Sequence, residues 1–227
     1  MKLNERPAAR AKLIGGRLCL DFVNAVGGRN PVSSSKKENA KAGLIREDKL
    51  NNYGDLLAWS QHVGLLTEGE MQKLLRESRQ RQSEAAAVFA RAIELREAIY
   101  RLCKAILNKT LPRQSDLALL NQELVIAYGR VRLATGKTNF AWEWIDATSA
   151  LDQMLWRITD SAAEFLTTGD FTRLRECSGE DCGWLFEDTS KNRRRQWCDM
   201  RDCGNLAKVR RFRTRSHPKT GKGELLG

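Results

Sequence analysis

Four cysteines near the C-terminus form two equally spaced pairs. Cys177 and Cys182 enclose four residues, Cys198 and Cys203 enclose four more, and fifteen residues separate the pairs. Pairs of this kind, joined by a loop of this length, are the usual way in which a short chain presents four thiolates to Zn²⁺. We therefore predict one zinc ion held by all four cysteines. With no ligand position left for water or substrate, the ion is expected to be structural.

A glycine follows the second cysteine of each pair, at Gly183 and Gly204. Glycine suits a tight turn with positive φ, from which neighbouring amides can donate to sulfur. The alternatives to a zinc site are two disulfides or four unconnected cysteines. No secretory signal and no long apolar run are seen, so we expect a cytoplasmic protein with no membrane contact. A reducing cytoplasm disfavours the disulfides.

Positive charge is concentrated in the same part of the chain. The net charge is +11, and residues 191–222 alone carry +10, whereas the first 190 residues carry +2. Such a cluster favours a nucleic-acid partner, because neutralised phosphates release counterions. We expect double-stranded DNA, with RNA as an alternative and a merely solvated face as another. The candidate contacts are Arg193, Arg194, Arg195, Arg201, Lys208, Arg210, Arg211, Arg213 and Arg215.

The elements that must position these residues are short. Residues 183–186 are predicted to form a strand, and the basic run 191–197 is predicted to return from it as a hairpin. Residues 205–215 are compatible with a helix in which Leu206, Val209 and Phe212 form an apolar ridge. Such a helix could present its basic residues to phosphates.

The rest of the chain is predicted to be a helical bundle, so the fold class is mainly α with a small four-cysteine finger. Apolar residues at helical spacing predict helices from Tyr53 to Gly64 and over 83–108. Further helices are predicted after a Thr67 capping box, after a Ser115 cap, and as one long or broken helix from Trp142 to Thr167. Residues 15–24 fit a short strand or a buried helix, and residues 27–51 fit a loop. The expected domains are 1–168 and 169–227.

Four residues in the apolar segments are candidates for a ligand pocket that would bind a small-molecule effector. They are Asp21, Asn24, Arg96 and Trp142. The alternatives are helix capping, core packing and a buried ion pair between Asp21 and Arg96. Cys19 and Cys103 lie in apolar patterns and are expected to pack in the core. No catalytic triad, phosphate loop or dinucleotide fingerprint is present, so we expect no enzyme.

Two stretches resemble known families. The C-terminal residues that carry the resemblance look like the CGNR zinc finger: Arg175–Cys177, Asp181–Phe186, Asp188–Ser190, Asn192–Arg193, Trp197–Cys198, Met200–Asn205 and Ala207–Arg211. Residues 16–24 and 95–100 resemble the ABATE domain that precedes this finger in bacterial proteins. The resemblance implies a stress-responsive transcriptional regulator with a helical sensing domain and a DNA-binding finger. The sequence departs from the motif at Leu206, where the family has arginine.

The leading hypothesis is therefore a zinc-dependent DNA-binding regulator. The alternative is a zinc-stabilised module that docks on another protein such as RNA polymerase, with Trp184, Phe186 and Trp197 as anchors. A homodimer is also a candidate, since symmetric dimers are common among DNA-binding regulators.

Overall fold

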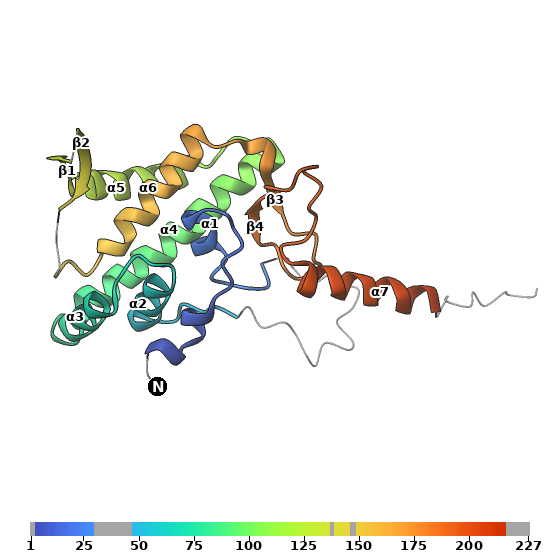
Figure 1. Cartoon of the computed structure of the whole chain (residues 1–227), viewed down its shortest axis with the longest axis horizontal. Helices are drawn as coiled ribbons and strands as arrows, with labels where there is room; N and C mark the ends of the chain where they lie inside the picture. The colour runs from blue at the N-terminus through green and yellow to red at the C-terminus, as the bar shows by residue number, and fades with distance from the viewer. Residues whose placement is uncertain (1–2, 30–46, 137–138, 146–148, 217–227) are drawn as a thin grey trace, which may run out of the picture.

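The fold is a helical bundle with a small finger packed against one end of it (Figure 1). The computed structural model describes residues 3–29, 47–136, 139–145 and 149–216. Two short 3-10 helices, η1 (Leu3–Glu5) and η2 (Pro7–Arg10), precede the bundle. The bundle contains α1 (Leu18–Val23), α2 (Tyr53–His62), α3 (Glu68–Gln80), α4 (Gln82–Asn108), α5 (Gln114–Tyr128) and α6 (Gln153–Thr168).

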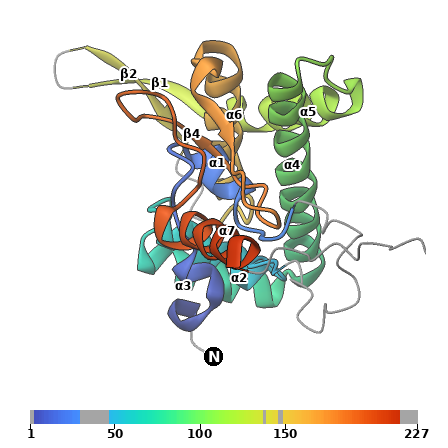
Figure 2. The same ribbon diagram turned by 90° about the vertical axis from the view of Figure 1, so that its right-hand side faces the viewer.

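Helix α4 is the centre of the bundle and contacts each of the other five bundle helices. Its buried face includes Ala92, Arg96, Ile99 and Cys103, which recur at the predicted spacing of three and four. The segment that fitted either a strand or a helix is a helix, α1, and its Cys19, Leu20, Phe22 and Val23 are all buried. Helix α1 contacts both α4 and α6, and Figure 2 shows it beside the lower end of α6.

Most helix boundaries follow the local sequence signals. Thr67 and Glu70 form the predicted capping box at the start of α3, and Gly64 has a φ of +78° just after α2 ends. The prediction that Ser115 caps the next helix was wrong. Helix α5 begins at Gln114, and its N-cap is Arg113, two residues before the predicted one and without a side-chain cap.

A hairpin replaces the first part of the long helix predicted from Trp142. Strand β1 (Val131–Thr135) pairs antiparallel with β2 (Phe140–Trp144), and Leu133 lies opposite Trp142. The two tryptophans were therefore misassigned. Their spacing of two residues fits one face of a strand and not one face of a helix. Trp144 stacks on Trp156 of α6 with ring centroids 6.3 Å apart, which attaches the hairpin to the bundle.

The finger contains a second hairpin and the last helix. Strand β3 (Leu174–Glu176) pairs with β4 (Leu185–Glu187), a π-helical turn η5 follows at Met200–Gly204, and α7 covers Asn205–Ser216. The predicted hairpin between residues 183–186 and 191–197 was wrong. The strand pairs backward with residues before the first cysteine, and the basic run is irregular. The finger thus encloses its first cysteine pair within a hairpin.

The structure describes only part of the loop predicted over residues 27–51. Residues 30–46 lie outside the described residues, and on either side of them Val26 and Asp48 form a single β-bridge. The predicted domain boundary at residue 168 coincides with the end of α6, but the hydrophobic core does not stop there. Leu174 and Leu185 of the finger are fully buried in the same apolar cluster as α1, α4 and α6.

Candidate metal centre and nucleic-acid interface

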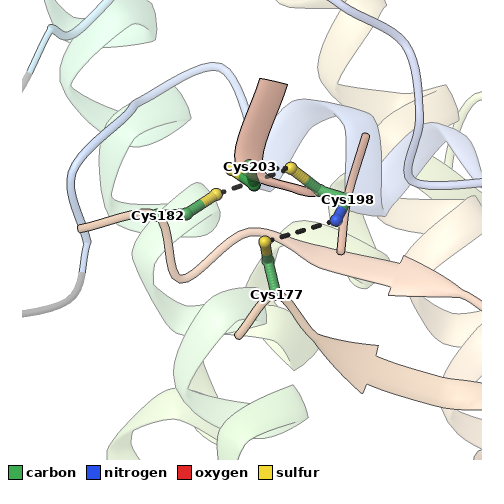
Figure 3. Close-up of side chains that lie close together, drawn as sticks. All are labelled: Cys177, Cys182, Cys198 and Cys203. Atoms are coloured by element: carbon green, nitrogen blue, oxygen red, sulfur yellow. Dashed lines mark hydrogen bonds between the residues drawn. The ribbon is translucent and has the colours of Figure 1, made fainter. Parts of the chain in front are cut away.

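The four predicted cysteines meet at one point (Figure 3). Their sulfur atoms all lie within 4.8 Å of one another. Cys182 Sγ is 3.6 Å from Cys198 Sγ, which is 3.5 Å from Cys203 Sγ. Tetrahedral Zn²⁺ with Zn–S bonds of about 2.3 Å would place its sulfurs about 3.8 Å apart. The spacing fits zinc, and none of the four cysteines forms a disulfide.

The electrostatics of the cluster are those of strongly coupled thiols. Hydrogen bonds from Cys182 and then from Cys198 and Cys203 lower the pKa of the Cys177 thiol. Contacts with Cys177 and then with Cys182 and Cys203 raise the pKa of Cys198. Four sulfurs this close cannot all be thiolates without a positive charge between them, and a set of four thiolates suits Zn²⁺. The site is that of one structural zinc ion.

Different kinds of backbone bring the four sulfurs together. Cys177 follows β3 directly and Cys182 lies three residues before β4, whereas Cys203 belongs to the π-turn that continues into α7. The amides of Gly179 and Cys198 donate to Cys177 Sγ over 3.4 and 3.3 Å. Such bonds orient the ligand and reduce the charge on sulfur.

The two glycines that follow the cysteine pairs differ in conformation. Gly183 has a φ of +67°, as predicted for a tight turn. Gly204 does not have a positive φ. A Cβ at Gly204 would lie 2.8 Å from Sδ of the exposed Met200 side chain, so that flexible side chain would have to move aside.

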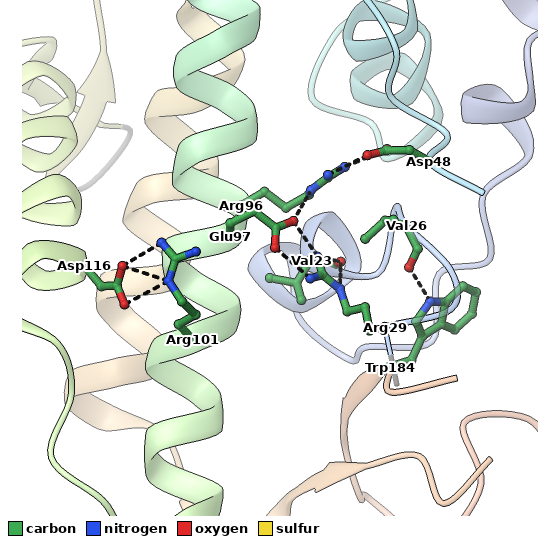
Figure 4. Close-up of polar contacts among 9 residues, drawn as sticks. All are labelled: Val23, Val26, Arg29, Asp48, Arg96, Glu97, Arg101, Asp116 and Trp184. Atoms are coloured by element: carbon green, nitrogen blue, oxygen red, sulfur yellow. Dashed lines mark hydrogen bonds and ion pairs between the residues drawn. The ribbon is translucent and has the colours of Figure 1, made fainter. Parts of the chain in front are cut away.

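The first half of the finger is bonded to the helical bundle. The Asn24 side chain donates to the Leu185 carbonyl over 2.7 Å and accepts from the Leu185 amide over 2.9 Å. Trp184 Nε1 donates to the Val26 carbonyl over 2.8 Å (Figure 4), and the Arg29 amide donates to the Cys182 carbonyl over 3.0 Å. The chain just after α1 therefore lies directly against the metal centre.

An ion network holds this segment on α4, as Figure 4 shows. Arg29, whose side chain is fully buried, forms two bonds to Glu97 of 2.9 and 3.0 Å and lies 4.1 Å from the Tyr100 ring centroid. Arg96 forms two bonds to Asp48 of 2.8 and 2.7 Å. Burial raises the pKa of Glu97, but bonds from Arg29 and Arg96 outweigh it and lower the pKa overall.

The structure places the four candidate pocket residues in separate environments. Asp21 accepts from the Gly15 amide, and burial raises the pKa of its carboxyl. Asn24 is bonded to Leu185, and Arg96 to Asp48 and not to Asp21. Trp142 is 76% exposed on β2. The four therefore do not converge on one pocket in the described residues.

Three of the nine candidate nucleic-acid contacts are engaged within the protein. Arg210 on α7 pairs with Glu180 and Asp181, 3.0 and 3.2 Å away between the first two cysteines. Arg195 lies 4.3 Å from the Phe186 ring centroid and bonds the carbonyls of Trp197 and Cys198. Arg193 bonds Thr172 and lies 3.7 Å from Asp170. These arginines hold the finger together.

Four other candidates are exposed and have no acidic partner among the described residues: Arg194, Lys208, Arg211 and Arg213. Arg201 is also exposed, but its charge, after the hydrogen bond from Lys12, helps to lower the pKa of the nearby Asp199. The side chain of Arg215 lies outside the described residues. The acids of the finger, by contrast, are already satisfied. Lys12 bonds both Asp199 (2.8 Å) and Asp202, Arg17 bonds Glu187, and Lys104 bonds Glu176. Asp188 accepts from the amides of Ser190 and Arg195.

Sequence reasoning missed the residues that fix the finger to its surroundings. Lys12 lies far from the cysteines in sequence, and Glu180 and Asp181 fall among the first 190 residues, whose charges nearly cancel. One signal was available in the sequence. Glu180 and Asp181 lie between two cysteines of the same metal site, and this places them near the segment that follows the second cysteine pair.

The predicted apolar ridge of α7 is present but exposed. Leu206, Val209 and Phe212 have 56%, 47% and 72% of their surface accessible. Ala207 and Arg210, on the other side of the helix, are the half-buried positions. Helix α7 therefore leaves Lys208, Arg211 and Arg213, together with its large apolar residues, in solvent.

Comparison with known families agrees with this architecture. Residues 173–216 match the CGNR zinc finger. Residues 16–169 match ABATE, described as "Putative stress-induced transcription regulator", and neither description names a catalytic activity. No curated protein compared with the chain matches it. Among the described helices, none is long and apolar enough to cross a membrane. Since the ABATE match covers more than half of the sequence, the chain belongs to the ABATE family and ends in a CGNR zinc finger that holds one structural zinc ion.

Proposed function

We propose that this protein is a transcriptional regulator that binds double-stranded DNA through the second half of its zinc finger. The observation that carries the proposal is the charge asymmetry of the finger. Its acids are paired or hydrogen-bonded, whereas Lys208, Arg211 and Arg213 stand exposed along α7 without an acidic partner in the described structure. Unpaired cations along an exposed helix attract a polyanion and release its counterions on binding.

Zinc contributes to DNA binding by positioning α7 and takes no part in the contact itself. Cys203 lies in the turn that becomes α7, so the metal fixes where the helix starts. Arg210 then fixes its direction by pairing with Glu180 and Asp181 in the other half of the finger. The exposed cations are thereby presented in one fixed arrangement, which lowers the entropy cost of binding.

Fluorescence anisotropy with labelled duplex DNA at several salt concentrations tests the proposal. The affinity should fall steeply with salt, and the logarithmic slope should decrease by about 0.9 for each phosphate contact removed. The test variant replaces Lys208, Arg211 and Arg213 by alanine. A control variant replaces Arg76, Arg79 and Arg113, which are also exposed but lie in the helical bundle.

The two variants carry the same net charge, so general charge effects cancel between them. The α7 variant should lose most of its affinity and up to about 2.7 in salt slope, and the control should bind like the unchanged protein. Undetectable binding, salt-independent binding, or equal losses in both variants would contradict the proposal. Stronger binding to duplex RNA than to duplex DNA would change the substrate to RNA.

The alternative, a protein-interaction module, has less support. Phe186 is fully buried beneath Arg195, and Trp184 is bonded to Val26. Two of the three expected anchors are therefore engaged within the protein. A small-molecule effector and a homodimer stay predictions.

A further inference from the structure

The outward face of α7 has an unusual composition. Counting 100° for each residue, Lys208, Phe212, Val209 and Arg213 occupy one arc of roughly 140° in that order around the helix. The opposite side, with Ala207 and Arg210, rests on the finger. Two large apolar side chains thus lie in the middle of an exposed face, and a cation lies on either side of them.

This arrangement differs from an ordinary solvated face. A surface helix normally turns its apolar stripe toward the core and its charges toward water. In α7 the apolar residues point away from the finger, with Val209 47% and Phe212 72% exposed. Leu206, 56% exposed, adds a third apolar side chain at the edge of the face. Such a face suits a partner that is apolar at its centre and negatively charged on both sides.

The shape of the region is compatible with insertion into a groove. Figure 1 shows α7 extending away from the bundle, and in Figure 2 the same helix lies in front of the bundle, toward the viewer. Among the helices and strands, its main packing contact is with the π-turn that precedes it. Twelve residues give a helix about 18 Å long and about 10–12 Å across with side chains. The major groove of DNA is about 12 Å wide and admits such a helix, whereas the minor groove, about 6 Å wide, does not.

We propose that α7 enters the major groove and reads thymine through its methyl group. This inference rests on the proposed DNA binding. The C5-methyl of thymine is the apolar group that base pairs present in the major groove, and phosphates line both edges of that groove. Val209 and Phe212 contact thymine methyls, while Lys208 and Arg213 contact the phosphates of the two strands. Specificity then comes from the apolar centre and affinity from the flanking cations.

Replacing thymine by uracil tests this directly, because uracil keeps the pairing and lacks only the methyl. A duplex selected by the protein from random DNA is compared with the same duplex carrying uracil in place of thymine. Each buried methyl should contribute about fourfold in affinity. The Val209→Ala, Phe212→Ala double variant should bind both duplexes equally, with its salt slope unchanged. Val125→Ala, an exposed apolar residue on α5, is the control and should still discriminate.

Alanine favours helix, so the double variant should keep α7, which zinc content and circular dichroism verify. Salt-dependent binding without any effect of uracil would overturn this inference and leave the proposed function standing. No binding to DNA at any salt concentration would overturn both. Light scattering gives a third outcome. A dimer that the double variant abolishes would assign the ridge to a second copy of the chain and overturn the inference.

Discussion

The two halves of the finger share one metal and one sequence pattern but differ in almost every contact. The first half, with β3 and β4, is bonded to the bundle through Asn24 and Trp184, and its Leu174 and Leu185 lie in the main core. The second half contains the π-turn and α7. Its Asp199 and Asp202 bond Lys12 of the N-terminal segment before α1, and α7 is left in solvent. The first half fixes the metal site to the bundle, and the metal in turn fixes the position of the second half.

The largest expected effect is loss of zinc, which should separate the two halves. Structural zinc contributes about 10–16 kcal/mol in small finger peptides, so chelation or Cys203→Ser should release α7. The β3–β4 hairpin should persist because the bundle core also holds it. Hydrogen exchange followed by mass spectrometry should show residues 200–216 losing protection while residues 174–187 keep most of theirs.

A matched cysteine outside the site provides the control for that experiment. Cys103 is fully buried in α4, and burial raises the pKa of its thiol. Cys103→Ala should retain one zinc per chain and normal protection of α7. Equal loss of protection in both halves of the finger on chelation would contradict the distinction between them.

The next largest effect should come from Asn24. Asn24→Ala removes both hydrogen bonds to Leu185 and leaves a buried amide and carbonyl without their partners, which should cost about 2–4 kcal/mol of unfolding free energy. Asn205→Ala, in the second half, removes one exposed bond to the Arg201 carbonyl and should cost about 0.5–1 kcal/mol. Urea unfolding measures both, and similar values would indicate that the two halves are equally anchored.

Arginines on α7 should divide into positioning and contact residues. Arg210→Ala frees the helix from Glu180 and Asp181, so we expect weaker DNA binding, about threefold to tenfold, with the salt slope unchanged. Arg211→Ala should weaken binding and also lower the slope by about 0.9. A lower slope for Arg210→Ala would show that Arg210 contacts phosphate itself.

The smallest effect is expected at Lys12, the tether of the second half. The pair is exposed, so Lys12→Ala should cost about 0.2–1 kcal/mol of unfolding free energy. The hydrogen bond from Lys12 lowers the pKa of Asp199 below its ordinary value of 3.8. The contribution of Asp199 is therefore complete at neutral pH and lost only as pH falls through that lowered pKa. Unfolding at pH 6 and pH 8 should show the same loss, and a larger loss at pH 6 would contradict this assignment.

The sequence predicted the metal centre and most helices because these depend on local spacing. Cysteine pairs, the Thr67 capping box and the helical repeat of α4 are all visible within a few turns of chain. The bond between Asn24 and Leu185 joins residues 161 positions apart, and no local pattern indicates it. The partner of β4 was missed because β3 is three residues long, too short to show a period of two.

The pairing of charged residues in the finger also could not be predicted from local sequence. The sequence gives the number of cations on the finger but not which acids they meet, so Arg210 and Arg211 were indistinguishable before their neighbours were placed. The β1–β2 hairpin was detectable in principle, since Val131, Leu133 and Thr135 alternate and face Trp144, Trp142 and Phe140. The aromatic residues had instead been assigned to the following helix.

The burial of Leu174 and Leu185 in the bundle core bears on how such a protein can be recombined. A finger transplanted alone onto another protein would expose two leucines to water, and the remaining bundle would keep a hole where they had been. Exchange of C-terminal parts between relatives should therefore succeed only with crossover points after residue 187. The second cysteine pair and α7, rather than the whole finger, are the segment that can be replaced.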